Sequence, residues 1–135
     1  MTGKRSVLFV CARNAGRSPL AEGLLRGIYG DRYDVYSAGF RPSTLNPLVA
    51  EVLEEQGIDS RSLYSKALRD IPSGPYDRVV LLTGPGEDPP SLPPAREYLR
   101  YSFPDPRSGS DGNGMDREGF RELRDRMKEW ITREF

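Results

Sequence analysis

The feature that most limits the fold of this chain is a short apolar run that passes directly into a loop and then into a helix. Residues 6–10 read SVLFV, a continuous apolar run typical of strands that are buried on both faces. A loop follows from Cys11 to Ser18, and Pro19 suits the first turn of a helix. Leucine and isoleucine then recur at helical spacing until Gly30. The order strand, loop, helix predicts one unit of a parallel sheet.

The same alternation continues along the chain. Strand patterns occur at 33–37, 78–82 and 98–103, and helical patterns begin after Asn46 and cover 120–131, where Trp130 is expected in the core. The stretch 83–95 holds five prolines and two glycines and is predicted to be a loop. Alternating strands and helices favour a parallel sheet with helices on both faces. We therefore predict a single-domain, three-layer α/β/α fold over residues 1–135.

The composition argues against several classes of protein. The 20 Lys and Arg residues balance the 20 Asp and Glu residues, so no global field favours nucleic acid or a membrane as partner. No apolar stretch approaches the roughly 20 residues that span a bilayer, and the polar start shows no signal peptide. The one cysteine excludes an internal disulfide and fits a cytoplasmic protein. Because histidine is absent, we expect no metal, and no other cofactor is indicated.

The loop CARNAGRS gathers groups that suit a tetrahedral oxyanion. Cys11 provides a nucleophilic sulfur, which we expect to be a reactive thiolate because a helix begins beside it. Backbone N–H groups at a helix N-terminus bind anions, and the planar guanidinium of Arg17 matches two oxygens. Ser18 can cap the helix and donate to the sulfur. The residues predicted to bind the oxyanion are Ala12, Arg13, Asn14, Ala15, Gly16, Arg17 and Ser18. A lone cysteine is more often a small buried apolar residue, but this context favours catalysis.

Chemistry on an oxyanion ester also needs an acid for the leaving oxygen. Without histidine, a carboxylic acid is the alternative. Asp105 lies between two prolines after the last predicted strand, so it can reach the same edge of the sheet as Cys11. A plain turn aspartate is the alternative interpretation, and Asp88, Asp111 and Asp116 also lie in or near loops. We expect Asp105 to be the general acid.

Several segments carry a family resemblance that covers most of the chain. They are VLFVCARNAGRSPLAEG, SAG at 37–39, Asn46 and Pro47 before a helix, Ser65 and Lys66, and FPDP before the last helix. These motifs resemble the superfamily of low-molecular-weight protein tyrosine phosphatases and thioredoxin- or mycothiol-linked arsenate reductases. The resemblance implies a four-stranded parallel sheet in flavodoxin-like order. It also implies Cys11 as nucleophile, Arg17 as oxyanion ligand, Asp105 as general acid, Ser18 as an aid to the sulfur and Asn14 as a brace for the loop.

The motifs divide between the two branches of that superfamily. SAGFRPSTLNP, NAGRS and FPDP look more like the reductases, whereas Ser18 followed by Pro19 looks like the phosphatases. Reductases usually carry further cysteines after the third strand, but Thr83 and Pro90 stand there, which excludes an internal thiol relay. Gly16 stands where phosphatases often carry a second cysteine, and Arg107 and Ser108 replace the tyrosines that usually follow their Asp-Pro turn.

We predict cysteine-dependent phosphomonoester hydrolysis, similar to that of protein tyrosine phosphatases, through a phosphocysteine intermediate. The alternative is an arsenate reductase that uses a single cysteine and an external thiol or redoxin. A second alternative is a non-catalytic oxyanion-binding module. The expected ligands are phosphate, arsenate or a phosphorylated substrate such as a phosphotyrosine protein, with a small thiol or redoxin as partner in the reductase. The sequence does not assign a role to the Gly- and Ser-rich loop at 108–114.

Overall fold

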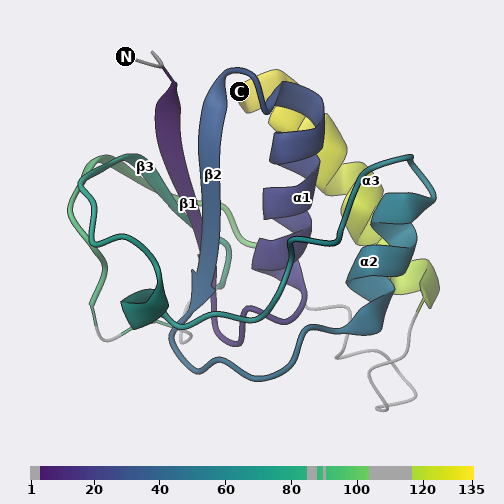
Figure 1. The fold of residues 1–135 in the computed structure, drawn as a ribbon, viewed down its shortest axis with the longest axis horizontal. Coiled ribbons are helices and arrows are strands. Elements are labelled where there is room, and N and C mark those ends of the chain that lie inside the picture. The colour runs from purple at the N-terminus through teal and green to yellow at the C-terminus, as the bar shows by residue number, and fades with distance from the viewer. Residues whose placement is uncertain (1–3, 85–87, 90, 104–116) are drawn as a thin grey trace.

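The computed structural model describes residues 4–84, 88–89, 91–103 and 117–135 of the chain. Strands and helices alternate along these residues as far as β3, which is followed by β4 without a helix between them (Figure 1). In chain order the elements are β1 (Arg5–Cys11), α1 (Arg17–Tyr29), β2 (Tyr33–Gly39), α2 (Pro47–Glu54), the 3₁₀ helix η1 (Leu68–Asp70), β3 (Tyr76–Leu81), β4 (Ala95–Arg100) and α3 (Arg117–Glu134). Among the described residues, no helix is both long and apolar enough to cross a membrane.

The four strands form one parallel sheet in the order β2-β1-β3-β4. This order confirms the predicted four-stranded, flavodoxin-like sheet. β1 lies between β2 and β3, and its residues 7–11 are buried, which explains the continuous apolar run in the sequence. β4 is the edge strand and is exposed apart from Ala95. Its alternating charges, Arg96, Glu97 and Arg100, are typical of an unpaired sheet edge.

The two faces of the sheet are covered differently. Val7 and Phe9 of β1 point to the face on which α1, α2 and α3 pack, so the three helices lie on one side of the sheet in Figure 1. Leu8 and Val10 point to the opposite face, where the partly buried side chains include Leu68 of η1 and residues of irregular segments. In the described residues, the layer on this second face is therefore η1 and loop rather than α-helix.

The helix boundaries follow local capping. Asn46 precedes α2, and its side chain accepts a hydrogen bond from the Leu48 N–H at 2.9 Å, with Pro47 at the first helical position as predicted. Gly57, just after α2, has φ 71°, which favours glycine at this turn. Trp130 of α3 is 3% exposed and packs among aromatic rings, as expected for a core residue.

β4 begins three residues earlier than the sequence pattern predicts. The carbonyl of Pro94 accepts from the Tyr76 N–H at 2.9 Å, so pairing with β3 starts as soon as the proline-rich stretch ends. Both faces of β4 are exposed, so its side chains carry no apolar alternation that marks its start. The chain continues beside β3 beyond the strand, and the Phe103 N–H donates to the Leu82 carbonyl at 3.1 Å.

An ion-pair cluster joins α3 to the end of α2. Arg121 and Arg124 approach the Glu55 carboxylate at 2.8 and 2.6 Å. Their hydrogen bonds lower the pKa of Glu55 from 4.5 to about 2. The cluster fixes the position of the first turns of α3 against the end of α2.

Candidate active site

The candidate active site lies at the carboxyl end of β1, where the strand passes into α1. Cys11 is the last residue of β1, and residues 12–16 form a loop, here called the anion loop, that leads to Arg17 at the start of α1. β1 is the central strand from which the chain first proceeds to β2 and later to β3 on the other side. Such a point, where the strand order reverses, is where open α/β sheets bind their ligands.

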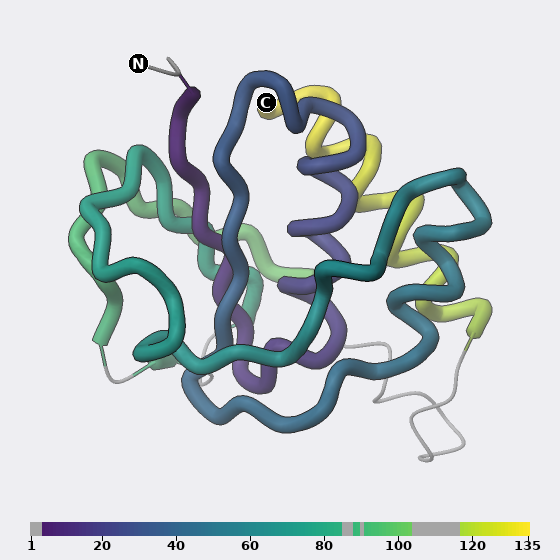
Figure 2. Tube along the Cα trace, in the orientation of Figure 1, coloured from purple at the N-terminus to yellow at the C-terminus, as the bar shows by residue number. Residues whose placement is uncertain are grey.

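The carbonyl groups of the anion loop are held from outside by another segment. Residues 40–46 run beside the loop (Figure 2). The backbone N–H groups of residues 41, 43 and 46 donate to the carbonyls of Ala12, Arg13 and Ala15 at 2.7, 3.2 and 2.9 Å. The Ser65 hydroxyl adds a hydrogen bond to the Arg13 carbonyl at 2.9 Å. Among the described residues, no backbone carbonyl accepts from the N–H groups of residues 12–16, which is the arrangement that an anion-binding loop requires.

Two residues allow this shape. Asn14 has φ 51°, a left-handed conformation that asparagine tolerates better than most residues. Gly39 ends β2 directly beside the loop, and a Cβ atom on it would lie 2.7 Å from the Asn14 nitrogen and 2.8 Å from the Ala12 oxygen. Any larger residue would therefore push against backbone atoms of the loop.

A buried hydrogen-bond network surrounds the sulfur of Cys11, which is 2% exposed. The Ser18 Oγ lies 2.9 Å from Cys11 Sγ, and the Asn14 Nδ2 donates to Ser18 Oγ at 2.7 Å. The Lys66 backbone N–H donates to Asn14 Oδ1 at 2.7 Å, which requires the amide oxygen of Asn14 on that side. Because Ser18 Oγ accepts from Asn14, its own proton is left for the sulfur. This geometry suits a sulfur that carries negative charge.

Arg17 is 6% exposed and is oriented by the end of the segment that follows β4. Its Nη1 donates to the Phe103 carbonyl at 3.3 Å. The structure thus brings Arg17 next to Phe103, which is the first residue of the FPDP motif in the sequence. Asp105 and the loop at 108–114 lie outside the described residues.

The structure brings most of the predicted site residues together. Ala12, Arg13, Asn14, Ala15, Gly16, Arg17 and Ser18 all belong to the loop or the first turn of α1 beside Cys11. Sequence reasoning did not assign site roles to Ser37 and Lys66, which hold the Asn14 side chain at 2.9 and 2.7 Å. Both occur in the family motifs, and that was the available signal. It also missed Glu22, a buried acid of α1 that lies in the first family motif but whose helical spacing does not distinguish it from a surface residue.

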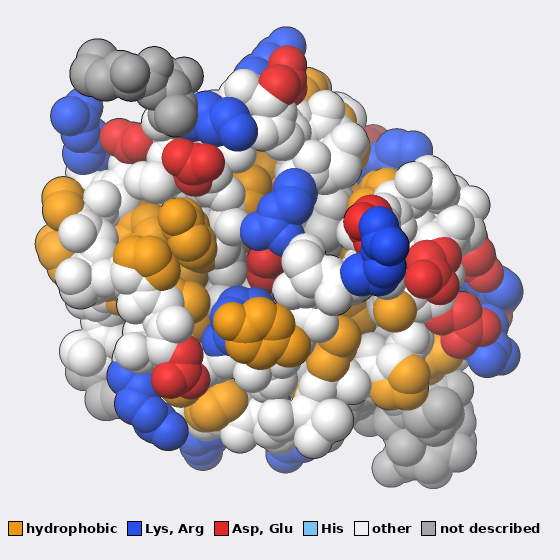
Figure 3. Space-filling model, in the orientation of Figure 1, with side chains coloured by type: hydrophobic (Ala, Val, Ile, Leu, Met, Phe, Trp, Pro, Cys, Tyr) orange, Lys and Arg blue, Asp and Glu red, His pale blue; other side chains and the backbone are white. Residues whose placement is uncertain are grey.

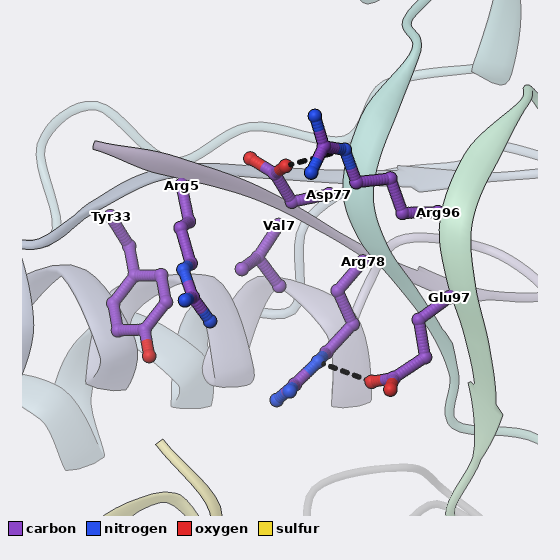
Figure 4. Close-up of a pocket in the computed structure, with 7 residues that line it drawn as sticks. All are labelled: Arg5, Val7, Tyr33, Asp77, Arg78, Arg96 and Glu97. Atoms are coloured by element: carbon purple, nitrogen blue, oxygen red, sulfur yellow. Dashed lines mark ion pairs between the residues drawn. The ribbon is translucent and has the colours of Figure 1, made fainter. Parts of the chain in front are cut away.

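Two cavities elsewhere are less suited to an oxyanion. One, of about 300 Å³, lies at the amino end of the strands, opposite Cys11, where Arg78 pairs with Glu97 at 2.8 Å and Arg96 with Asp77 at 3.6 Å (Figure 4). The other, of about 470 Å³, borders Gly39 and has walls that include Phe40, Leu68 and Leu92. Hydrophobic side chains are visible in Figure 3 on the side of the sheet away from α1, α2 and α3. Apart from Arg5 in the first cavity and Arg69 in the second, the charges of the first are paired and the walls of the second are largely apolar, so the anion loop stays the candidate oxyanion site.

The fold and the loop together are those of an enzyme of the low-molecular-weight phosphatase superfamily. Residues 6–133 match the family described as low molecular weight phosphotyrosine protein phosphatase, and the chain belongs to it. The arsenate reductase of Halalkalibacterium halodurans is 34% identical over 128 residues, which cover 92% of this chain and 90% of that protein. The glutaredoxin arsenate reductase of Synechocystis sp. is 32% identical over 127 residues, which cover 94% and 93%.

Solved structures of this superfamily are also similar to the chain. A structure described as an arsenate reductase in the phosphate binding state aligns with a TM-score of 0.79 and 30% identity over 96% of this chain and 95% of that one. The tyrosine phosphatase AmsI of Erwinia amylovora aligns with a TM-score of 0.70 at 19% identity over 96% and 89%, which shows a shared fold alone.

These findings overturn the predicted phosphomonoester hydrolysis. The relatives and solved structures between 30% and 34% identity are named arsenate reductases, so they favour the alternative reading. The error has a chemical reason. Attack of a cysteine on a tetrahedral oxyanion is common to both reactions, so the anion loop predicts the first step equally well for both. The second step differs only in whether water or a thiol attacks, and the loop residues do not encode that choice.

Proposed function

We propose that the chain is an arsenate reductase that uses one cysteine and takes its electrons from an external thiol or redoxin. The observation that carries the proposal is the nearly full-length similarity to proteins named arsenate reductases, at 34% identity over 92% of the chain. The need for an external reductant follows from the sequence, in which Cys11 is the only cysteine. Reduction of arsenate to arsenite requires two electrons, and a single thiol cannot supply them by forming a disulfide within the chain.

In the first step, the Cys11 thiolate attacks arsenic and forms a sulfur–arsenic bond. One arsenic–oxygen bond breaks, and the departing hydroxide takes a proton and leaves as water. The N–H groups of the anion loop and the guanidinium of Arg17 bind the remaining oxygens. The hydrogen bond of 2.9 Å between Ser18 and Cys11 supports a thiolate as the attacking group. Asp105 as the proton donor stays a prediction from the sequence.

In the second step, an external thiolate attacks Cys11 Sγ. A disulfide forms between the external sulfur and Cys11, the sulfur–arsenic bond breaks, and its electron pair stays on arsenic, which leaves as arsenite. A second external thiolate then attacks the mixed disulfide and releases Cys11 as a thiolate. Each turnover therefore converts one arsenate and two thiols into one arsenite, one disulfide and one water. Thr83, where thiol-relay relatives would carry cysteine, has a hydroxyl that cannot take part in this exchange.

The test is arsenate reduction with three electron donors: glutathione with glutaredoxin, mycothiol with mycoredoxin, and thioredoxin with its reductase. We expect arsenite to form with at least one donor, at one disulfide per arsenite, and to disappear in Cys11→Ser. The protein incubated without a thiol should form none. A failure of all three donors would refute the proposal, and Cys11-dependent hydrolysis of p-nitrophenyl phosphate in the same preparation would restore the phosphatase reading.

A further inference from the structure

Two charged side chains are buried beneath the anion loop, and the proposed chemistry does not use them. Glu22 of α1 is 3% exposed and Lys66 is 6% exposed, with 3.4 Å between Lys66 Nζ and Glu22 Oε1. Charges are rarely buried so completely, because each loses its hydration and the attraction between them only partly offsets that cost. A buried pair of this kind needs a reason beyond stability.

Glu22 is connected to the sulfur through a continuous chain of hydrogen bonds. The Ser37 hydroxyl donates to Glu22 Oε1, and Asn14 Nδ2 donates to Ser37 Oγ at 2.9 Å. The same Nδ2 donates to Ser18 Oγ at 2.7 Å, and Ser18 Oγ lies 2.9 Å from Cys11 Sγ. We call these five residues the buried hydrogen-bond chain. It joins α1, β2 and the anion loop.

The carboxylate of Glu22 fixes the direction of the hydrogen bonds between Glu22 and Ser18. A carboxylate oxygen can only accept, so the Ser37 hydroxyl donates to Glu22 and the Ser37 oxygen must accept from Asn14. The NH₂ group of Asn14 therefore faces both serines and uses its two protons on them. The Ser18 proton is then not needed by Asn14 and can be donated to Cys11 Sγ, which lies 2.9 Å away. If Asn14 were turned over, its oxygen would take the Ser18 proton away from the sulfur.

Lys66 supports this arrangement in two ways. Its ammonium lies 3.4 Å from one carboxylate oxygen of Glu22, and Arg26 binds the other at 2.7 Å, so two cations face the buried carboxylate. Its backbone N–H donates to Asn14 Oδ1 at 2.7 Å and so holds the amide in the required orientation. The ammonium is itself fixed by the Tyr64 carbonyl at 2.8 Å and lies 4.4 Å from the centre of the Tyr64 ring.

We propose that Glu22 and Lys66 are positioning residues for Cys11, which orient the buried hydrogen-bond chain so that the Ser18 hydroxyl donates to the sulfur and stabilises the thiolate. The inference rests on the proposed function only in that Cys11 is the nucleophile. It predicts an effect on the thiol that can be measured without arsenate.

The test is the rate of Cys11 alkylation by iodoacetamide as a function of pH. In Glu22→Met, loss of the oriented Ser18 hydrogen bond should move the midpoint of this profile up by about one pH unit, because the thiolate then loses a hydrogen bond to its charged sulfur. A purely coulombic effect has the opposite sign, because removing a negative charge favours the thiolate. An unchanged or lower midpoint would overturn the proposal.

Ser37→Ala provides a second variant that changes no charge and decides the question if Glu22→Met does not fold. It should also raise the midpoint, because Glu22 is then disconnected from Asn14. In a Ser18→Ala background, Glu22→Met should cause no further upward shift, because only the coulombic effect of opposite sign remains, and a full additional upward shift would refute action through Ser18. The control is Glu51→Met, which removes an exposed, ion-paired carboxylate of α2 and should leave the midpoint unchanged. Arg26 and Lys66, the cations that pair with Glu22, remain in these variants.

The outcome separates the two proposals. If the midpoints shift as expected but no thiol donor supports arsenate reduction, the positioning role stands and the proposed function fails. If arsenate is reduced but Glu22→Met and Ser37→Ala leave the midpoint in place, the function stands and the positioning role fails.

Discussion

Replacing Gly39 by alanine should damage the anion loop although Gly39 touches no bound anion. Gly39 is aligned with Cys11 across β1 and β2. A Cβ atom at this position would lie 2.7 Å from the Asn14 nitrogen, 2.8 Å from the Ala12 oxygen and 2.8 Å from the Arg13 carbonyl carbon. All three are backbone atoms, so no flexible side chain can move aside, and the loop or the end of β2 has to shift.

The size of the effect follows from these contacts. Overpacking a fixed site costs about 1–3 kcal/mol of folding stability. The same shift misplaces the loop N–H groups, and the loss of one or two such donors to an anion costs about 1–3 kcal/mol, or roughly tenfold to hundredfold in affinity. We therefore expect Gly39→Ala to lose both stability and affinity for phosphate, used as the probe of the loop.

Urea unfolding followed by Trp130 fluorescence measures the stability, and protection of Cys11 from alkylation by phosphate measures the affinity. Gly57→Ala is the matched control, because φ 71° makes alanine unfavourable there by about 1 kcal/mol while the added Cβ meets nothing within 4 Å. It should lose stability and keep phosphate affinity. Wild-type phosphate affinity in Gly39→Ala would refute the reasoning.

Three further predictions concern the core, the helix contact and the predicted acid. Phe120→Ala should cost about 3–5 kcal/mol, because the ring is fully buried beneath the anion loop, whereas the exposed Tyr98→Ala should cost little in the same urea titration. The pKa of Glu55 is lowered to about 2, so its stabilising contribution is present above the ordinary value of 4.5 and is lost as the pH falls towards 2. Glu55→Gln should accordingly be less stable than wild type at pH 7, with a difference that shrinks between pH 5 and pH 2; a constant difference would contradict this. Asp105→Asn should slow arsenate turnover and leave phosphate affinity nearly intact, and unchanged turnover would remove Asp105 from the acid role.

The sheet and the position of the anion loop could be predicted from the sequence because both depend on local patterns. The continuous apolar run before Cys11 is required by burial on both faces of β1, and the loop residues are contiguous, so their spacing is visible without a structure. The cap at Asn46 was predictable for the same reason. The predicted bounds of β4 were three residues too late because an exposed edge strand has no buried face to impose an apolar pattern.

The environment of the sulfur could not be read in the same way. Ser37 and Lys66 lie 23 and 52 residues from Asn14 in the sequence. The parallel pairing of β1 with β2 brings Ser37 to its side chain, and the hydrogen bond from the Gly39 N–H to the Lys66 carbonyl holds Lys66 beside it. Glu22 resembles a surface glutamate in the sequence, and its burial depends on this tertiary contact. The choice between hydrolysis and reduction depends on the second attacking group, which approaches from outside the chain.

The outward hydrogen bonds of the anion loop have a consequence for selectivity. The N–H groups of residues 41, 43 and 46 already hold the carbonyls of the anion loop, so the loop is ordered before an anion binds. Binding therefore costs little conformational entropy of the loop. Arsenate and phosphate share a tetrahedral form and the same charge, so a rigid ring of amides has few means to tell them apart. Discrimination then falls to the electron transfer, because phosphorus(V) does not accept the electrons that arsenic(V) does. We therefore expect phosphate to bind the anion loop in competition with arsenate and to be released without being reduced.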